Sequence, residues 1–414
     1  MKIKDIVTFV SKSITPQKGV TYNLYSLPSF DEGKTFEVLD GADIQSNKYD
    51  VPNKCILFNK LNVRFKRVWR IDSHDENKIA STEFLPLVVD EDVVDFQYCY
   101  YLLISDKITN YLCGQNTNTS GSHKRIDPDN FLNIEIKLPK MSIQRQVGKT
   151  LSALDRKIVL NKQINDNLEA MAKQLYDYWF VQFDFPNEEG KPYKSSGGAM
   201  VWNEKLKREI PQGWSISNVK SLIEPIERGI SYSSDDLLDP FATPMINLAC
   251  FSKAGDYRLG EMKFFSGKVS NDKLISPMDM LIACTDMTQG ADIIGRPILA
   301  SDEYDQYTFS TDLALITPKG KFKMYLYYTL RTPFYHKYIR PFASGTTVKH
   351  LNLIGVENYG LPVPPIEIQS KFEDLITPVK EKQSKNLNEI NALTKQRDEL
   401  LPLLMNGQAS VNSD

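Results

Sequence analysis

The chain has 414 residues and a mass of 47.3 kDa, which at roughly 150 residues per domain predicts about two to three domains. Its composition of 41% apolar and 25% charged residues is typical of globular proteins and excludes a disordered, collagen-like or simple coiled-coil chain. The net charge is −2, so any binding of nucleic acid must come from local basic patches rather than from bulk charge.

Cysteine and histidine give no sign of a disulfide framework or a zinc site. The five cysteines are scattered without C-x-x-C spacing, which indicates buried or incidental thiols in a reducing cytoplasm. No two of the four histidines lie four positions apart, so bound zinc is not expected. The N-terminus lacks a long apolar segment, and no stretch reaches about 18 apolar residues. We therefore expect a cytoplasmic protein without signal peptide, membrane span or membrane partner.

Two long segments of the chain repeat each other. Ile143–Phe180 and Ile368–Leu404 both have helical periodicity, and they align at an offset of 225 positions without a gap. The matched pairs are Ile143 and Ile368, Gln144 and Gln369, Val147 and Phe372, Leu151 and Ile376, Leu154 and Val379, Asn161 and Asn386, Leu168 and Leu393, and Leu175 and Leu400. Upstream, Pro52 matches Pro277, Ser81-Thr82 matches Ser310-Thr311, Tyr98 matches Tyr325, Ser120-Gly121 matches Ser344-Gly345, and Leu138-Pro139 matches Leu361-Pro362. So many pairs in one order predict an internal duplication.

Each copy is expected to be a mixed domain followed by a long helix. Short β-branched and aromatic runs separated by Gly, Pro and Asn indicate strands and turns, whereas Phe96–Ile104 and Met324–Leu330 read as helices, so the fold class is α/β in the mixed, α+β sense. The segment between the copies is rich in Pro, Gly, Ser and charge, which is typical of a loop. The predicted parts are a first domain at 1–141, a helix at 142–184, a linker at 185–213, a second domain at 214–365, a helix at 366–405 and a tail at 406–414.

The two predicted helices have the pattern of a packed pair. Apolar residues recur at steps of about four and three, which places them on one face, and Asn161 and Asn386 interrupt the two stripes at equivalent points. A polar residue in a helix seam costs stability but fixes register and partner. We expect the helices to pair antiparallel as a coiled-coil spacer between the domains, each spanning roughly 50 Å, in a molecule with pseudo-two-fold symmetry.

Two other arrangements of these helices remain open from the sequence. Both could be buried inside one globular core instead of forming a spacer. Pro378 lies within the second helical segment, and because proline lacks a backbone N–H, it predicts that this helix begins or kinks there.

Two stretches are basic and contain no acidic residue. Val51–Ile71 has six Lys and Arg residues with Phe65 and Trp69 between them, and Leu313–Val356 has seven over 44 residues. Clustered Lys and Arg contact phosphates, and Arg also reads guanine in the major groove. The alternative is a solvated face, or acids that lie opposite these bases in space. The residues expected to bind DNA are Lys60, Arg64, Lys66, Arg67, Arg70, Lys124, Arg125, Arg331, Lys337, Arg340, Lys349 and His350.

The sequence contains little that indicates catalysis. It has no P-loop, no G-x-G-x-x-G, no G-x-S-x-G and no Asp/Asn-Pro-Pro-Tyr/Phe motif of amino-methyltransferases. Asp129, Glu135 and Lys137 nominally match the Pro-Asp…Glu-x-Lys arrangement of metal-dependent nucleases, in which carboxylates hold Mg²⁺. Their spacing is short for that geometry, and the second copy has no such set. A self-contained nuclease and a coiled-coil adaptor without nucleic acid stay as alternatives.

Several long motifs carry a family resemblance. Ala343–Asn352, Leu361–Pro365, Tyr178–Gly198 and Ile210-Pro-Gln-Gly-Trp214 resemble a type I restriction–modification specificity subunit, and with the duplication the likeness covers nearly the whole chain. The first copy departs from the pattern because it lacks an Ile-Pro-x-Gly-Trp start and because Thr119–Ile126 is a looser Ser-Gly motif.

The resemblance implies a fold and a function. Such subunits carry two target recognition domains, each binding one half of a bipartite double-stranded DNA target, and their helices set the spacing. They are not catalytic and are expected to bind no cofactor or metal themselves. Two methyltransferase subunits that use S-adenosylmethionine to methylate adenine dock on them, as do motor-nuclease subunits that use ATP and Mg²⁺.

Overall fold

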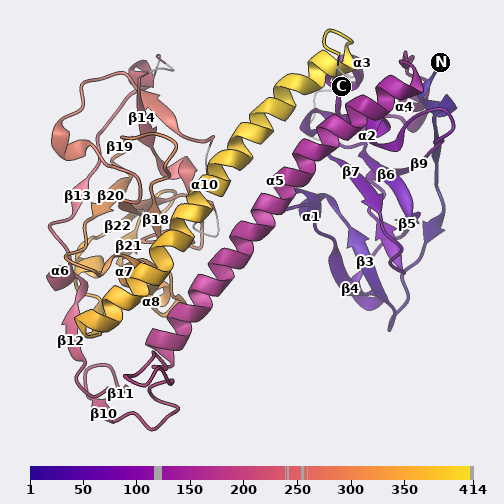
Figure 1. Cartoon of the computed structure of the whole chain (residues 1–414). Coiled ribbons are helices and arrows are strands. Elements are labelled where there is room, and N and C mark those ends of the chain that lie inside the picture. The colour runs from indigo at the N-terminus through magenta and orange to yellow at the C-terminus, as the bar shows by residue number, and fades with distance from the viewer. Residues whose placement is uncertain (116–123, 238, 240–241, 253–255, 259, 411–414) are drawn as a thin grey trace. The chain divides into compact units, whose positions relative to one another are not determined.

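A computed structural model gives the structure of the chain and describes residues 1–115, 124–237, 239, 242–252, 256–258 and 260–410. The chain forms two compact units, Met1–Lys157 with Leu393–Asp414, and Ile158–Ala392, here called unit 1 and unit 2. Two long helices, α5 (Met141–Tyr176) and α10 (Ile366–Met405), each have residues in both units (Figure 1). Each unit therefore consists of a mixed domain and a segment of both helices.

Unit 1 is built on two sheets with short helices around them. The four-stranded sheet has the order β1-β9-β6-β7, and the five-stranded sheet has the order β2-β5-β8-β3-β4. The strands are β1 (Val7–Phe9), β2 (Ser13–Ile14), β3 (Thr21–Tyr25), β4 (Glu37–Asp40), β5 (Lys48–Asp50), β6 (Lys54–Asn59), β7 (Val68–Asp72), β8 (Lys78–Ala80) and β9 (Phe84–Val89). The helices are α1 (Leu27–Asp31), α2 (Phe96–Ile104), α3 (Asp106–Gln115) and α4 (Pro128–Leu132).

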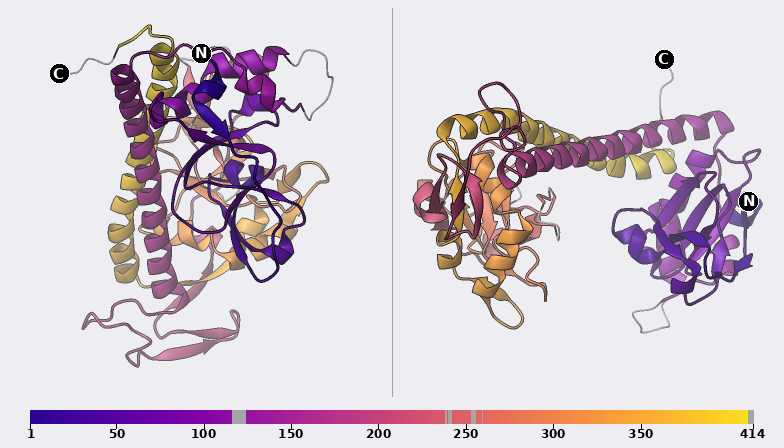
Figure 2. Two further views of the ribbon diagram at one scale, coloured as in Figure 1. Left: turned by 90° about the vertical axis from the view of Figure 1, so that its right-hand side faces the viewer. Right: turned by 90° about the horizontal axis from the view of Figure 1, so that it is seen from below.

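Unit 2 has a larger set of small sheets. They have the orders β13-β20-β16-β18, β15-β14-β19, β17-β22-β21, β10-β11 and β12-β23. The strands are β10 (Met200–Asn203), β11 (Arg208–Pro211), β12 (Ser215–Asn218), β13 (Glu227–Arg228), β14 (Thr243–Ile246), β15 (Lys263–Phe265), β16 (Met280–Ala283), β17 (Thr285–Asp286), β18 (Pro297–Leu299), β19 (Thr308–Phe309), β20 (Leu313–Ile316), β21 (Ala343–Ser344), β22 (Lys349–Leu351) and β23 (Gly360–Val363). The helices are α6 (Val219–Leu222), α7 (Lys323–Thr329), α8 (Pro333–Ile339) and α9 (Ile354–Glu357). The hairpin β10–β11 extends beyond the end of α5 (Figure 2).

The duplication seen in the sequence is present in the fold. The sheets β1-β9-β6-β7 and β13-β20-β16-β18 have equivalent strands in the same order, and β6 and β16 are each antiparallel to their neighbours β9 and β20. The predicted helices at Phe96–Ile104 and Met324–Leu330 are present as α2 and α7. The match that uses Ser120-Gly121 lies outside the described residues.

The starts of the two long helices are equivalent in detail. Gln144 and Gln369 are buried, and each donates its side-chain amide to the carbonyl five residues earlier, at 2.9 Å from Pro139 in the first copy and to Pro364 in the second. Because the side chain satisfies a backbone group beside the helix start, it fixes where the chain turns into the helix. α10 begins at Ile366 and runs through Pro378, so the alternative in which this helix begins at the proline is wrong.

Within unit 2, α5 and α10 pair antiparallel through a polar seam. Asn161 and Asn386 are 7% and 2% exposed. Asn161 donates to the Glu389 carboxylate at 2.8 Å, and Asn386 donates to the Asn165 side-chain oxygen at 2.9 Å. Gln383 and Asn165 also exchange hydrogen bonds with each other's backbone carbonyls at 2.9 and 3.0 Å. A slip of one turn would leave these buried amides unpaired, so the seam holds the register, as the sequence predicts.

Unit 1 uses a different polar contact to hold the helices on its domain. Asp155 of α5 accepts a hydrogen bond of 2.5 Å from the Tyr101 hydroxyl of α2 and pairs at 2.9 Å with Arg397 of α10. Around it, Val147, Leu151 and Leu404 are buried in the same core as the sheet and α2. One carboxylate therefore joins the domain to both helix segments.

The cysteines supply a test of this packing. Cys55, Cys99, Cys250 and Cys284 are buried and Cys113 is exposed. Burial raises the pKa of the thiol to about 12 for Cys55, Cys99 and Cys284 and to about 11 for Cys250. Since the thiolate is the reactive form, we expect a thiol reagent near neutral pH to label Cys113 rapidly and the other four only after denaturation. Fast labelling of a second thiol in the native protein would contradict the packing.

Candidate nucleic-acid interface

The basic stretch of the first domain is partly balanced by acids from distant parts of the chain. Lys66 pairs with Asp106 at 2.5 Å, and Arg67 makes two hydrogen bonds of 2.7 Å to the Asp31 carboxylate. The absence of acids within Val51–Ile71 therefore did not mean an unbalanced positive surface. Pairs of this kind at an exposed surface contribute little stability, but they reduce the charge available to a phosphate.

One exposed aromatic group in this stretch is flanked by two arginines. Phe65 is 52% exposed, and the guanidinium groups of Arg64 and Arg67 both lie 4.8 Å from its ring centre. Cations over an aromatic face are attracted to it, so they keep the ring in place while its edges stay open to solvent. Arginine beside an exposed ring is a combination that suits contact with nucleic-acid bases and phosphates.

Tertiary structure brings Lys124 and Arg125 next to Lys60, far from them in the sequence. Leu61 and Arg125 form a β-bridge, so Lys124 and Arg125 lie beside Lys60. Arg125 is bound to Glu83, with a shortest distance of 2.7 Å. The sequence separation of more than sixty residues hides this neighbourhood, and only the bridge reveals it.

Arg70 faces the domain interior rather than the exposed edge. Its guanidinium lies 5.1 Å from the ring centre of Tyr100 and donates to the side-chain oxygen of Gln97. Both partners belong to α2. The contacts indicate a role in packing β7 on α2, and a direct DNA contact by Arg70 remains an untested prediction.

The second domain has a basic pocket of about 660 Å³. Four predicted residues line it, namely Arg331, Lys337, Arg340 and Lys349, and Lys173, Arg296 and His336 add further basic side chains. The complete lining is Lys173, Gln289, Gly290, Ala291, Arg296, Arg331, Pro333, His336, Lys337, Arg340, Pro341, Ala343 and Lys349, with no carboxylate among these residues. A cleft lined by one sign of charge concentrates the field and attracts anions.

Helix α8 supplies one side of this pocket. Thr332 precedes the helix, and its side-chain hydroxyl accepts a hydrogen bond of 3.2 Å from the backbone N–H of Tyr335 in the first turn. Pro333, at the first position of the helix, also favours a helix start. His336, Lys337 and Arg340 then follow within about one helical turn, so they project from adjacent positions. A local capping signal in the sequence therefore sets the spacing of three basic side chains.

A buried carboxylate shapes the loop that contacts α8 through the hydrogen bond of 2.9 Å between the His336 side chain and the Ala291 carbonyl. Asp286 is 0% exposed, and it accepts backbone hydrogen bonds from Thr288 and Ile293 at 2.7 Å and from Ile294 at 3.2 Å. These bonds fold residues 288–294 around the carboxylate and present 289–291 to the pocket. The loop backbone is thus fixed before any ligand binds.

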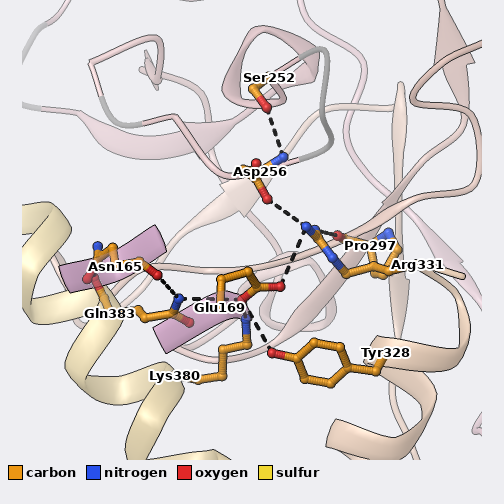
Figure 3. Close-up of polar contacts among 9 residues, drawn as sticks. All are labelled: Asn165, Glu169, Ser252, Asp256, Pro297, Tyr328, Arg331, Lys380 and Gln383. Atoms are coloured by element: carbon orange, nitrogen blue, oxygen red, sulfur yellow. Dashed lines mark hydrogen bonds and ion pairs between the residues drawn. The ribbon is translucent and has the colours of Figure 1, made fainter. Parts of the chain in front are cut away.

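Arg331 is the least accessible of the predicted residues. Its side chain is 13% exposed and contacts Asp256 at 2.6 Å and Glu169 at 3.8 Å, as Figure 3 shows. Burial alone would lower the pKa of Arg331, but the Tyr327 hydroxyl and the two carboxylates raise it above its ordinary value. Two acids already neutralise most of this charge, so Arg331 is better suited to hold the pocket in shape than to bind a phosphate.

Two further predictions lie outside the pocket. Neighbouring residues of a strand point to opposite faces, so His350, which follows Lys349 in β22, is directed away from the pocket and is exposed. Asp129, Glu135 and Lys137 are exposed as well, and the described part of the chain contains no group of three His, Cys, Asp or Glu residues placed to hold a metal ion.

Two basic residues of the pocket were not expected from the sequence. Lys173 belongs to α5, which the sequence assigned to the spacer, and Arg296 lies outside the acid-free stretch. Burial and the positive charge of Arg331 lower the pKa of Arg296. No feature of the sequence indicates either position, because both reach the pocket only through the packing of unit 2.

Among the helices that the structure describes, none combines the length and the apolar character that a membrane span requires.

Comparison with known proteins identifies relatives over most of the chain. A family model described as type I restriction modification DNA specificity domain matches residues 1–170 and 211–395. The chain is 25% identical over 346 residues to the type I restriction enzyme MjaIX specificity subunit of Methanocaldococcus jannaschii, covering 81% of this chain and 74% of that protein. It is 22% identical over 425 residues to the HindI specificity subunit of Haemophilus influenzae, covering 88% and 90%. A crystal structure of a type I restriction–modification S subunit from M. genitalium superposes with a TM-score of 0.61 at 14% identity, over 100% of this chain and 96% of that chain.

Proposed function

The chain belongs to the family of type I restriction–modification DNA specificity domains, and from this membership we propose how it recognises DNA. It is a DNA specificity subunit with two target recognition domains, and each domain binds one half of a bipartite double-stranded DNA sequence. The single observation that carries this proposal is the duplication, since both family matches contain one mixed domain and most of one long helix. Two equivalent readers in one chain suit a target with two halves.

In this proposal the helix pair sets the distance between the two half-sites. The buried amides of Asn161 and Asn386 support it because they give the pair one register in unit 2. A spacer with several registers would allow several gaps, whereas a single register specifies one.

The chemistry is assigned to partner subunits. Two methyltransferase subunits, which methylate adenine with S-adenosylmethionine, are expected to dock on the chain. Motor-nuclease subunits, which use ATP and Mg²⁺, are expected to dock as well. The complex is expected to act in the cytoplasm, where the DNA lies. The chain itself is expected to be non-catalytic and to bind none of these cofactors. Cleavage by the purified chain alone with Mg²⁺, abolished in Asp129→Ala, would instead support the nuclease alternative.

The test is methylation sequencing of DNA from cells that express the chain with its modification subunits. We expect methylated adenines at one bipartite sequence, two defined halves with an undefined gap of fixed length, and no such methylation when the chain is deleted. Methylation that persists without the chain, or that follows a single uninterrupted sequence, would refute the assignment. If the assembled complex showed neither methylation nor salt-sensitive binding to DNA, the adaptor alternative would be favoured.

A further inference from the structure

One wall of the basic pocket comes from a long helix rather than from the second domain itself. Lys173 of α5 lines the pocket with Lys337, Arg340 and Lys349. These four residues come from α5, α8 with the turn after it, and β22, so three separate parts of unit 2 direct positive charge at one space. Positive side chains so close together repel each other, and this repulsion raises the free energy unless solvent or an anion lies between them.

The segment of α5 next to the pocket is held firmly. Glu169, one turn before Lys173, pairs with Lys380 of α10 and with Arg331, and it accepts a hydrogen bond of 3.3 Å from the Tyr328 hydroxyl (Figure 3). Tyr328 is the equivalent of Tyr101, whose hydroxyl contacts Asp155 in unit 1. Burial by itself would raise the pKa of Glu169, but Lys380 and Arg331 lower it below its usual value. The carboxylate is therefore charged and joins both helices to the pocket lining.

Lys173 itself is available for a ligand. It is exposed, and no residue in the described part of the chain forms a side-chain hydrogen bond or ion pair with it. Residues four apart on a helix lie on the same face, but the Glu169 carboxylate pairs with Lys380 and Arg331 instead of Lys173. The amino group can thus approach a phosphate without first breaking a contact.

We propose that α5 takes part in DNA binding directly: Lys173 binds a backbone phosphate in the basic pocket, and Glu169 is a positioning residue that holds this helix segment against the pocket through Arg331 and Lys380. The inference rests on the proposed function and deepens it. The same helix that sets the gap between half-sites also contacts the DNA of the second half-site, so spacing and reading share one rigid element.

The first test measures the dissociation constant of the full chain, in complex with its modification subunits, for a random-sequence DNA duplex at several salt concentrations. Lys173→Gln should lower the slope of log affinity against log salt by about 0.9, the value for one lost phosphate contact, and weaken binding about fivefold at 0.15 M salt. Lys162→Gln, which removes the same charge from the same helix outside the pocket, should change the slope little. Equal slopes for both variants would overturn the inference.

Glu169→Gln separates positioning from simple charge. Removing a negative charge near a phosphate site should tighten binding by electrostatics alone, whereas loss of positioning should weaken it about tenfold. Asp166→Asn is the control, since it removes an exposed carboxylate of α5. Tighter binding by a folded Glu169→Gln protein would refute the positioning role. If Glu169→Gln does not fold, the Lys173→Gln measurement still decides the phosphate contact.

Absence of salt-dependent binding by the unmodified complex would refute the proposed function. Normal binding by the unmodified complex, together with an unchanged slope for Lys173→Gln, would refute only this inference.

Discussion

Replacing Lys337, Arg340 and Lys349 together by glutamine is expected to weaken binding of the assembled complex to duplex DNA about 100-fold at 0.15 M salt. The three side chains line the basic pocket, and they have no carboxylate partner among the described residues. Each lost phosphate contact removes about 0.9 from the slope of log affinity against log salt, so the slope should fall by about 2.7. Fluorescence anisotropy titrations with a labelled duplex at several salt concentrations measure both quantities.

The chain offers a matched control for this variant. Lys319, Lys321 and Lys323 belong to the same acid-free stretch but do not line the pocket, so their replacement by glutamine changes the net charge equally. We expect this second variant to bind nearly as tightly as the unmodified complex. Equal weakening by the two triple variants would mean that general charge, and not the pocket, attracts the DNA.

Lengthening both helices by one heptad should lengthen the gap in the DNA target. The units meet within each helix at Lys157–Ile158 and Ala392–Leu393, and seven residues inserted at both points add about 10 Å of helix while nearly preserving the apolar stripe. At about 3.4 Å per base pair this distance corresponds to roughly three base pairs. Methylation sequencing should show unchanged half-sites at the longer spacing.

Insertion into α5 alone is the control for the helix-length experiment. It leaves the two helices unequal, so the pairs that Asn161 and Asn386 form with α10 and α5 cannot all be kept together with the contacts in unit 1. We expect this variant to lose methylation and to melt at a lower temperature. New half-sites at the old spacing in the doubly lengthened protein would show that the helices do not measure the gap.

Much of the fold follows from patterns that are local in the sequence. The apolar stripes and the polar interruptions at Asn161 and Asn386 predicted two paired helices, because the spacing of apolar residues along one short segment shows the helical period. The offset of 225 positions predicted two equivalent domains, and the matching strand orders β1-β9-β6-β7 and β13-β20-β16-β18 agree with it. Pro378 does not mark the start of the second helix, because α10 runs through it without the one backbone hydrogen bond that proline cannot donate.

The sequence by itself determined that this protein has two copies of a mixed domain, two long helices with one register and basic stretches without nearby acids. Only the tertiary structure decided which of those bases are neutralised, as Arg67 is by Asp31, and which gather in a pocket with a helix residue such as Lys173. Apolar residues that will be buried recur with the period of the helix or strand, so this pattern can be recognised from neighbouring positions in the sequence. Electrostatic partners depend on which distant elements come within a few ångströms, and that is fixed by packing alone.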